Sequence, residues 1–160
     1  MLKLTKKADY GLIALRHLAI GVESAESASA KQIAEQYSIP LPLLSKVLQR
    51  LARSGFLESL QGTNGGYRLA RPSDEISVLE VIHTIDGPVI LTSCFHDDQE
   101  CDHMSNCSVR EPLRKVHEAI SRLLASITIA DISSGEIPAH RAKGSLAGGQ
   151  LIGIDELVRS

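Results

Sequence analysis

The chain has 160 residues, of which 43% are hydrophobic and 22% charged, as in an ordinary globular protein large enough for a real core. Only 3% of the residues are aromatic and Trp is absent, so Leu, Ile, Val and Ala must build that core, which suits helices better than a β-sandwich. The apolar runs are shorter than the roughly 18–20 residues of a membrane helix, and the first residues lack the apolar stretch of a signal peptide. We therefore expect a cytoplasmic protein with no membrane partner.

The formal net charge of −2 is unevenly distributed along the chain. Residues 1–71 contain ten Lys or Arg and five Asp or Glu, whereas residues 86–102 contain five acids and neither Lys nor Arg. This division favours a first half that meets phosphate and a second half with a different task. An unevenly charged but merely solvated surface is the alternative interpretation.

Three helices are predicted in the first third of the chain. Apolar residues at helical spacing indicate a helix from Thr5 to Ile20. A capping box at Ser29 opens a second, short helix over residues 30–37. A third helix is predicted over residues 42–54, because Pro suits the first turn of a helix and Gly follows as a stop signal.

Two short strands, over residues 56–60 and 67–70, follow the third helix. The turn between them contains Asn-Gly and Gly-Gly, which supply the positive φ values of a hairpin. A second capping box, at Ser77, opens a further helix that ends at Gly87. The order helix, short helix, turn, helix, hairpin is that of a winged helix-turn-helix. We therefore expect a mainly α fold with a small β-hairpin, in which residues 1–88 form a winged helix-turn-helix DNA-binding domain.

The second half of the chain is predicted to contain one long helix. Residues 89–108 form a polar loop, and a helix is expected from Pro112 to Ala130. Its apolar residues repeat at spacings of three and four, the pattern of a coiled-coil seam, so we assign residues 109–132 to dimerisation. Residues 133–160 are rich in Gly, Ser and Ala and are expected to form a flexible tail. The seam consists of Leu113, Val116, Ile120, Leu123 and Ile127.

The third helix and the hairpin carry the candidate DNA-binding residues. Lys46 and Arg50 share one helix face, and Arg or Lys can read guanine edges while Gln can read adenine. A glycine-rich hairpin tip lets the backbone approach phosphates or the minor groove closely. The alternative is a protein-interaction module with a solvated polar face. The predicted DNA-binding residues are Lys31, Ser45, Lys46, Gln49, Arg50, Arg53, Gln61, Asn64 and Gly65.

The three cysteines of the chain, Cys94, Cys101 and Cys107, all lie in the polar loop. A stable disulfide is not expected in a cytoplasmic protein, and an odd number leaves one thiol over. Thiolates bind soft or borderline metals well. An iron–sulfur cluster accepts wide ligand spacing, so the pattern C-x6-C-x5-C is compatible with one.

Other kinds of cysteine site stay open at this point. A structural zinc site would use His96 or His103 as its fourth ligand, but such sites usually contain C-x2–4-C pairs. Redox chemistry of the thiols alone is a further alternative. A catalytic Cys–His pair would need an oxyanion or base arrangement that the sequence does not reveal, so we do not expect an enzyme.

Residues 1–132 resemble the IscR/NsrR family of bacterial iron–sulfur transcription regulators. The overall look is closest to regulators of iron–sulfur assembly operons of the sulfur-mobilisation (SUF) type. The matching residues are Leu4-Thr5, Asp9-Tyr10-Gly11-Leu12, Ile33-Ala34, Ile39-Pro40, Leu44, Leu51, Ser54-Gly55-Phe56, Gly62 to Leu69 with Asn-Gly-Gly-Tyr at its centre, the three cysteines and Thr128-Ile129-Ala130-Asp131.

The resemblance implies a homodimer that represses transcription from a palindromic DNA operator. It also implies a cluster, [2Fe–2S] rather than [4Fe–4S], that is held by the three cysteines and alters DNA affinity. Some members place a His ligand where this chain has Arg110, whereas others use an Asp of the second subunit that matches Asp9. Many members have Arg before the first wing glycine, where this chain has Gln61. The alternative is a winged-helix regulator that senses redox, nitric oxide or zinc through the same cysteines.

Overall fold

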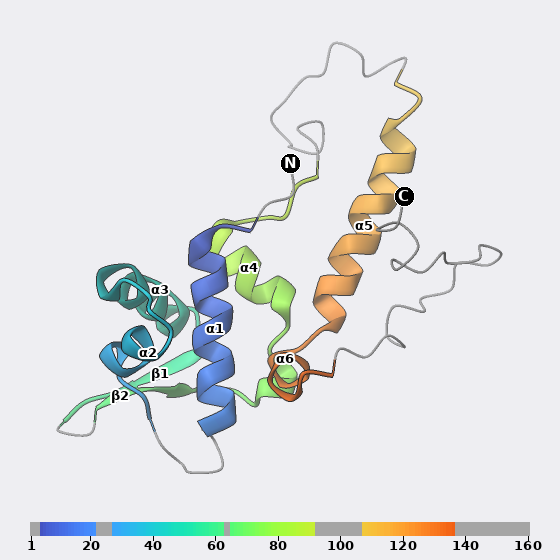
Figure 1. The fold of residues 1–160 in the computed structure, drawn as a ribbon. Coiled ribbons are helices and arrows are strands. Elements are labelled where there is room, and N and C mark those ends of the chain that lie inside the picture. Colours follow the sequence, from blue (N-terminus) through green and yellow to red (C-terminus); the bar gives the residue numbers. More distant parts are fainter. Residues whose placement is uncertain (1–3, 22–26, 63–64, 92–106, 137–160) are drawn as a thin grey trace, which may run out of the picture.

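Three helices and a hairpin form the N-terminal part of the protein (Figure 1). The structure is a computed structural model that describes residues 4–21, 27–62, 65–91 and 107–136. The order of its helices and strands confirms the winged helix-turn-helix predicted from the sequence. The first elements are α1 (Lys6–Ile20), α2 (Ala30–Gln36), α3 (Leu41–Arg53), β1 (Leu57–Leu60) and β2 (Gly66–Leu69).

Polar side chains begin the helices where the sequence predicts them to. The Ser29 hydroxyl accepts from the Gln32 amide and the Gln32 side chain accepts from the Ser29 amide, which confirms the first capping box. Ser77 and Glu80 form the second, which opens α4 (Val78–Asp86). α1 starts on the Thr5 hydroxyl, which accepts from the Ala8 amide at 3.3 Å. Each of these bonds joins residues three positions apart, so the sequence alone indicates where the helix starts.

The hairpin is antiparallel, with Leu57 opposite Leu69 and Leu60 opposite Gly66. β1 is one residue shorter than predicted, because Phe56 lies just outside the ladder, and β2 is shifted by one residue, so that it includes Gly66 and excludes Ala70. Gly55 follows α3 with φ +78°, a left-handed conformation that suits the glycine predicted to end this helix.

One hydrophobic core joins α1, α2, α3 and the hairpin. α1 crosses α3 and α4 at Gly11, where a Cβ atom would lie 2.3 Å from Cδ1 of Ile85, so that the end of this side chain would have to move, and 3.5 Å from Cγ1 of Val47. The absence of a side chain at this crossing allows α3 and α4 to approach α1 closely. The largest fully buried side chains of the hydrophobic core are Leu15, Ile33, Leu44, Leu48, Leu51, Ile76, Val81 and Ile129.

The predicted long helix is wrong at its C-terminal end. A short 3-10 helix, η2 (Ser73–Glu75), precedes α4, and the later elements are α5 (Arg110–Ser126) and α6 (Ile129–Ser134). α5 stops at Ser126, and a third capping box at Thr128 starts α6 in a new direction. The predicted boundary at residue 132 therefore falls inside α6, and the described part of the predicted tail includes the end of that helix.

Tertiary hydrogen bonds explain this break. The Val78 amide donates to the Ile127 carbonyl, and the Ile129 amide donates to the Ile76 carbonyl, each at 2.9 Å. These bonds hold Ile127 and Thr128 in extended conformations, with ψ of 126° and 167°. Ile127 and Thr128 are both β-branched, a type of residue that helices accommodate less well. The backbone thus exchanges helical bonds for a bridge to the winged domain.

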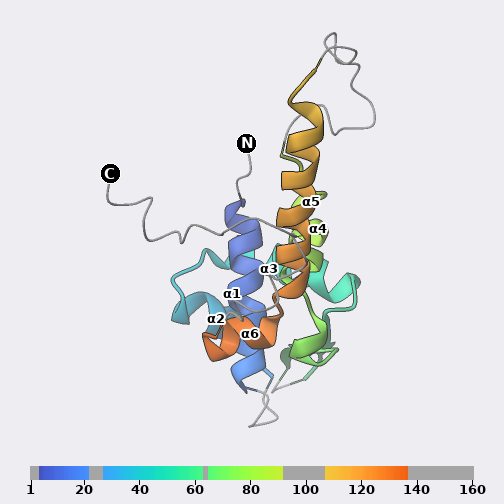
Figure 2. The same cartoon turned by 90° about the vertical axis from the view of Figure 1, so that its right-hand side faces the viewer.

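α6 packs across α1, and α5 rises beyond the winged domain (Figure 2). The Arg16 side chain donates to the Ile132 carbonyl at 3.3 Å, and Ile129 is fully buried in the main core. α6 is therefore part of the winged domain, although it follows the long helix in the chain. In the described part of the chain, none of the helices is long and apolar enough to cross a membrane.

We expect Ile129→Ala to lower the free energy of unfolding by about 2–5 kcal/mol, because the truncation leaves a cavity at a fully buried position. Val109→Ala, at a 56% exposed position, should change the free energy of unfolding by less than about 0.5 kcal/mol. Urea unfolding at one fixed protein concentration measures both. Equal effects of the two variants would contradict a structural role for α6.

Candidate nucleic-acid interface and sensor residues

The face of α3 opposite its buried side is polar and basic. Lys46, Gln49, Arg50 and Arg53 are exposed, and Ser45 is half-buried. The buried side consists of Leu44, Val47, Leu48 and Leu51, as the apolar periodicity predicts. Packing therefore orients α3 so that four of the predicted DNA-contacting side chains point outward together.

α3 and the hairpin lie on one side of the molecule, and α5 lies on the other (Figure 1). Lys31, on α2, is exposed on the same winged domain and lies 3.8 Å from Glu35. An exposed i,i+4 pair of this kind holds its lysine only weakly, so Lys31 can exchange Glu35 for a phosphate. The basic groups of α2 and α3 thus belong to the half of the molecule that α5 leaves uncovered.

The hairpin turn depends on glycine at Gly65. A Cβ atom at this position would lie 2.6 Å from the Leu60 carbonyl oxygen and 2.9 Å from the Gly62 carbonyl oxygen, and backbone atoms cannot give way cheaply. Gln61 is exposed beside it, whereas Asn64 lies outside the described residues. Arg68, the nearest arginine on β2, is held by Glu58 at 2.8 Å. Gln61 is therefore the predicted wing side chain that the structure places at the surface.

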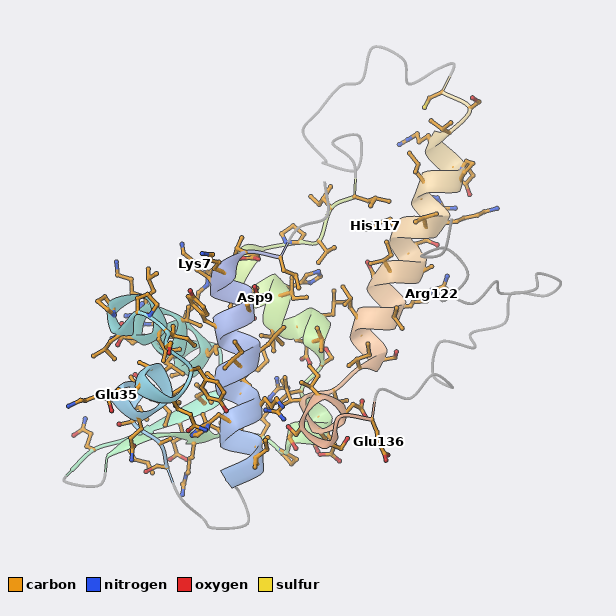
Figure 3. The ribbon with its side chains drawn as sticks, in the orientation of Figure 1. Lys7, Asp9, Glu35, His117, Arg122 and Glu136 are labelled. Atoms are coloured by element: carbon orange, nitrogen blue, oxygen red, sulfur yellow. The ribbon has the colours of Figure 1, made fainter. Side chains whose placement is uncertain are left out.

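The predicted sensor residues are only partly described. Asp9 is exposed in the first turn of α1, and Cys107 is a half-buried free thiol just before α5 (Figure 3 labels Asp9). Within residues 4–21, 27–62, 65–91 and 107–136, no three His, Cys, Asp or Glu side chains gather as a metal site would require. Cys94, Cys101, His96 and His103 lie outside these ranges. Asp9 lies in α1, whereas Cys107 lies three residues before α5.

A contact that the sequence did not reveal joins the start of α1 to the end of α4. The Thr5 hydroxyl donates to one oxygen of Asp86 at 2.5 Å, and the Thr5 amide donates to the other at 3.1 Å. Asp86 is thus a second cap for the helix that carries Asp9. It also stands directly before the segment that leads to the cysteines. A capping Thr is visible in the sequence, but a partner 81 residues away is not.

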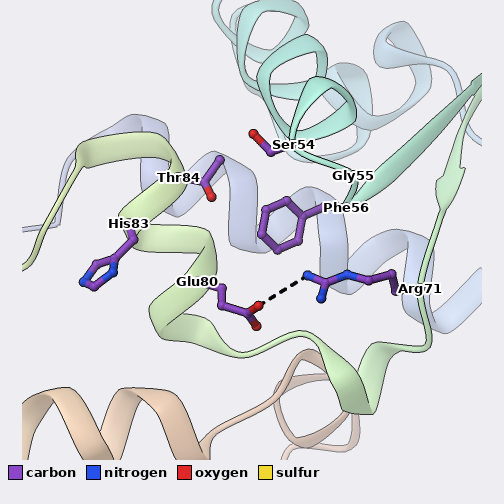
Figure 4. Close-up of a pocket in the computed structure, with 7 residues that line it drawn as sticks. All are labelled: Ser54, Gly55, Phe56, Arg71, Glu80, His83 and Thr84. Atoms are coloured by element: carbon purple, nitrogen blue, oxygen red, sulfur yellow. Dashed lines mark ion pairs between the residues drawn. The ribbon is translucent and has the colours of Figure 1, made fainter.

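A hollow of about 530 Å³ lies between the end of α3, the exit of the hairpin and α4 (Figure 4). Arg71 stacks on the Phe56 ring, 4.9 Å from its centroid, and pairs with Glu80 at 3.6 Å. A hydrogen bond from the Ser77 backbone, helped by Arg71, lowers the pKa of Glu80. These contacts brace the hairpin against α4, and Arg71 is therefore engaged in structure.

α5 exposes apolar side chains along much of its length. Its C-terminal end is anchored, because Leu124 packs against a small cluster of Val78, Ile82 and Val89. Farther along the helix, Val116 is 47% and Leu123 is 42% exposed, and both belong to the predicted seam. Glu111, Arg114 and Glu118 form ion pairs on the polar side. α5 thus presents an apolar strip that the other described residues leave open.

Comparisons with known proteins agree with this architecture. A family described as "Iron-dependent Transcriptional regulator" (Rrf2) matches residues 4–135. The chain is 32% identical over 136 residues to the HTH-type transcriptional regulator NsrR of Halalkalibacterium halodurans, which covers 84% of this chain and 92% of that protein.

Two solved structures extend the likeness to the fold. CymR (YrzC), the global cysteine regulator of B. subtilis, matches with a TM-score of 0.71 at 27% identity, over 84% of this chain and 98% of that one. T. potens IscR matches with a TM-score of 0.64 at 29% identity, over 84% and 88% of the two chains. The winged architecture and the family match lead to one conclusion: this chain belongs to the Rrf2 family of transcription regulators, which are DNA-binding proteins and not enzymes.

Proposed function

We propose that the protein is a cytoplasmic, homodimeric repressor whose affinity for a palindromic operator is controlled by an iron–sulfur cluster. The observation that carries the DNA-binding half is the exposed polar face of α3, with Lys46, Gln49 and Arg50 opposite a fully apolar side. A helix of 13 residues is about 20 Å long and fits the major groove. The genes of iron–sulfur assembly are the proposed targets.

Each predicted contact has a proposed task in this interface. Lys46 stands near the start of α3, the end that enters the groove most deeply, and reads bases. Arg53 stands at the far end and binds phosphate, while Arg50 can reach either target. Ser45, Gln49, Lys31 and the wing residues Gln61, Asn64 and Gly65 complete the contact surface.

The cysteines are proposed to hold the cluster. Cys107 is a free, half-buried thiol, a donor that suits iron, and Cys94 and Cys101 supply two further thiols of the same chain. The NsrR and IscR relatives are members of the same family, which is described as iron-dependent. When bound, the cluster would supply a group sensitive to iron supply and oxidants, and we propose the [2Fe–2S] type. The likeness to CymR, a cysteine regulator, favours thiol redox sensing without a cluster as the second candidate.

The fourth ligand is proposed to be Asp9 of the second copy in the dimer. Asp9 is exposed and lies one turn beyond Thr5, whose hydroxyl is bound by Asp86. A purely structural role is the alternative for Asp9, since an acidic side chain in the first turn of a helix interacts favourably with the helix dipole. If Asp9 is a ligand, then α1 connects the cluster to α3, because the two helices cross at Gly11. A coupling of about 1–3 kcal/mol along this path is enough for a switch.

We expect Cys94→Ala, Cys101→Ala and Cys107→Ala each to lose iron and sulfide, measured on protein purified without air. Wild-type protein should be brown, with visible charge-transfer bands, whereas zinc or thiol sensors are colourless. Full iron content in any one variant would exclude that cysteine.

Asp9→Ala should alter the visible spectrum of the cluster or shorten the cluster lifetime. If neither changes, Asp9 serves only to interact favourably with the helix dipole.

Leu123→Glu should convert the dimer to a monomer, because it places a charge on the apolar strip of α5. Ala125→Glu, on the opposite and exposed face of the same helix, should leave the dimer intact. Sedimentation velocity distinguishes the two states. A folded Leu123→Glu protein that still sediments as a dimer would show that the strip has another role.

Lys46→Ala and Arg53→Ala should weaken operator binding in different ways. Loss of a base contact costs about 1–3 kcal/mol and removes discrimination at one position, whereas loss of a phosphate contact weakens all sequences and lowers the salt slope by about one. Lys115→Ala, an exposed lysine of α5, is the control and should change neither quantity. Titrations at two salt concentrations, with the cluster-bound and cluster-free forms, measure all of these. Equal operator affinities of the two forms would contradict control by the cluster, while the proposed DNA-binding function would still stand.

A further inference from the structure

The start of α3 is apolar and exposed, unlike the starts of the other helices of the winged domain. Leu41 is 42% and Leu43 is 40% exposed, and the prolines Pro40 and Pro42 beside them are exposed as well. α1, α2, α4 and α6 each begin on a Thr or Ser hydroxyl that accepts an amide hydrogen bond. At α3, Pro40 occupies that place and supplies no side-chain bond.

This apolar turn, residues 40–43, is a poor partner for phosphate. Pro40 and Pro42 have no amide hydrogen. The Leu43 amide donates to the Pro40 carbonyl at 3.0 Å, and the Leu44 amide donates to the same oxygen at 3.1 Å. Among the described amides of this turn, Leu41 alone retains the free N–H that a first helical position leaves. The turn therefore offers carbon surface where many helices offer donors.

The apolar turn continues the basic face of the same helix. Leu43 precedes Lys46 by three residues and Arg50 by seven, so the three side chains share one side of α3. The core does not need Leu41 or Leu43, because the buried side of α3 is complete with Leu44, Val47, Leu48 and Leu51. An exposed apolar turn in line with cationic side chains fits a ligand that is anionic along its edges and carries apolar groups within.

Double-stranded DNA has that chemistry. In the major groove, the C5-methyl group of thymine is the apolar feature that distinguishes a base pair. The N-terminal residues of a recognition helix contact base edges. We infer that Leu43, with Leu41 beside it, reads thymine methyl groups, so that the operator requires T·A pairs at the positions that meet the start of α3. This inference rests on the proposed DNA-binding function and names the base feature that α3 selects.

The test removes the methyl group from the DNA and leaves its hydrogen bonds unchanged. Wild-type protein first selects its operator from a random duplex library, and each thymine of the selected site is then replaced by uracil in turn. Burial of one methyl group corresponds to about a fourfold change in affinity, so one or two positions should weaken binding about three- to fivefold. In Leu43→Ala, the same replacement should have no further effect.

Matched variants separate this reading from a general loss of fit. Ile20→Ala, at a 52% exposed position of α1, should bind like the wild type and keep its preference for thymine over uracil. Circular dichroism melts confirm that each variant is folded. If no duplex is enriched, the proposed DNA-binding function fails. If an operator is enriched but uracil replaces every thymine without loss, or Leu43→Ala keeps the full preference for thymine, DNA binding stands and the inference is overturned.

Discussion

The pair of backbone hydrogen bonds between residues 76–78 and 127–129 determines how α5 and α6 are arranged on the winged domain. Without them, the apolar and polar pattern that runs past residue 126 would extend one straight helix away from the winged domain. With them, Ile127 and Thr128 become extended, α5 ends, and α6 returns to pack on α1. The open apolar strip of α5 therefore emerges from a rigid base. Its other end leads directly back to Cys107.

α1 connects the parts of the molecule that a regulator must couple. Its first turn holds Asp9 and is capped by Asp86, its middle crosses α3 and α4 at Gly11, and its Arg16 binds the backbone of α6. A change at the first turn thus has a packed route to the back of the reading helix.

The charge of the protein is best understood by region. α2 and α3, which carry exposed cations, lie across α1 from α5 (Figure 1). Three other arginines form ion pairs: Arg68 with Glu58, Arg71 with Glu80, and Arg114 with Glu111 and Glu118. α3 therefore contributes three exposed cations, Lys46, Arg50 and Arg53, to this side of the molecule. A chain with a formal net charge of −2 can still carry a basic reading surface in this way.

Much of the secondary structure of this protein could be predicted from its sequence, because it depends on interactions between residues close together in the chain. The capping boxes at Ser29 and Ser77 and the apolar side of α3 involve residues within a few positions of one another, and all three are found as predicted. The hairpin is also found, but its positive φ falls on Gly62 and not on Gly65 or Gly66 of the predicted Asn-Gly and Gly-Gly pairs. The family resemblance followed from the same short motifs. The break before Thr128, the Asp86 cap on Thr5 and the exposure of Leu41 and Leu43 could not be predicted in this way. Each of these features depends on which distant segment lies opposite. The residues around Thr128, Thr5 or Leu43 are the same in the sequence whether or not a distant partner contacts them. Only the packing of α1, α4 and α6 against one another decides those partners.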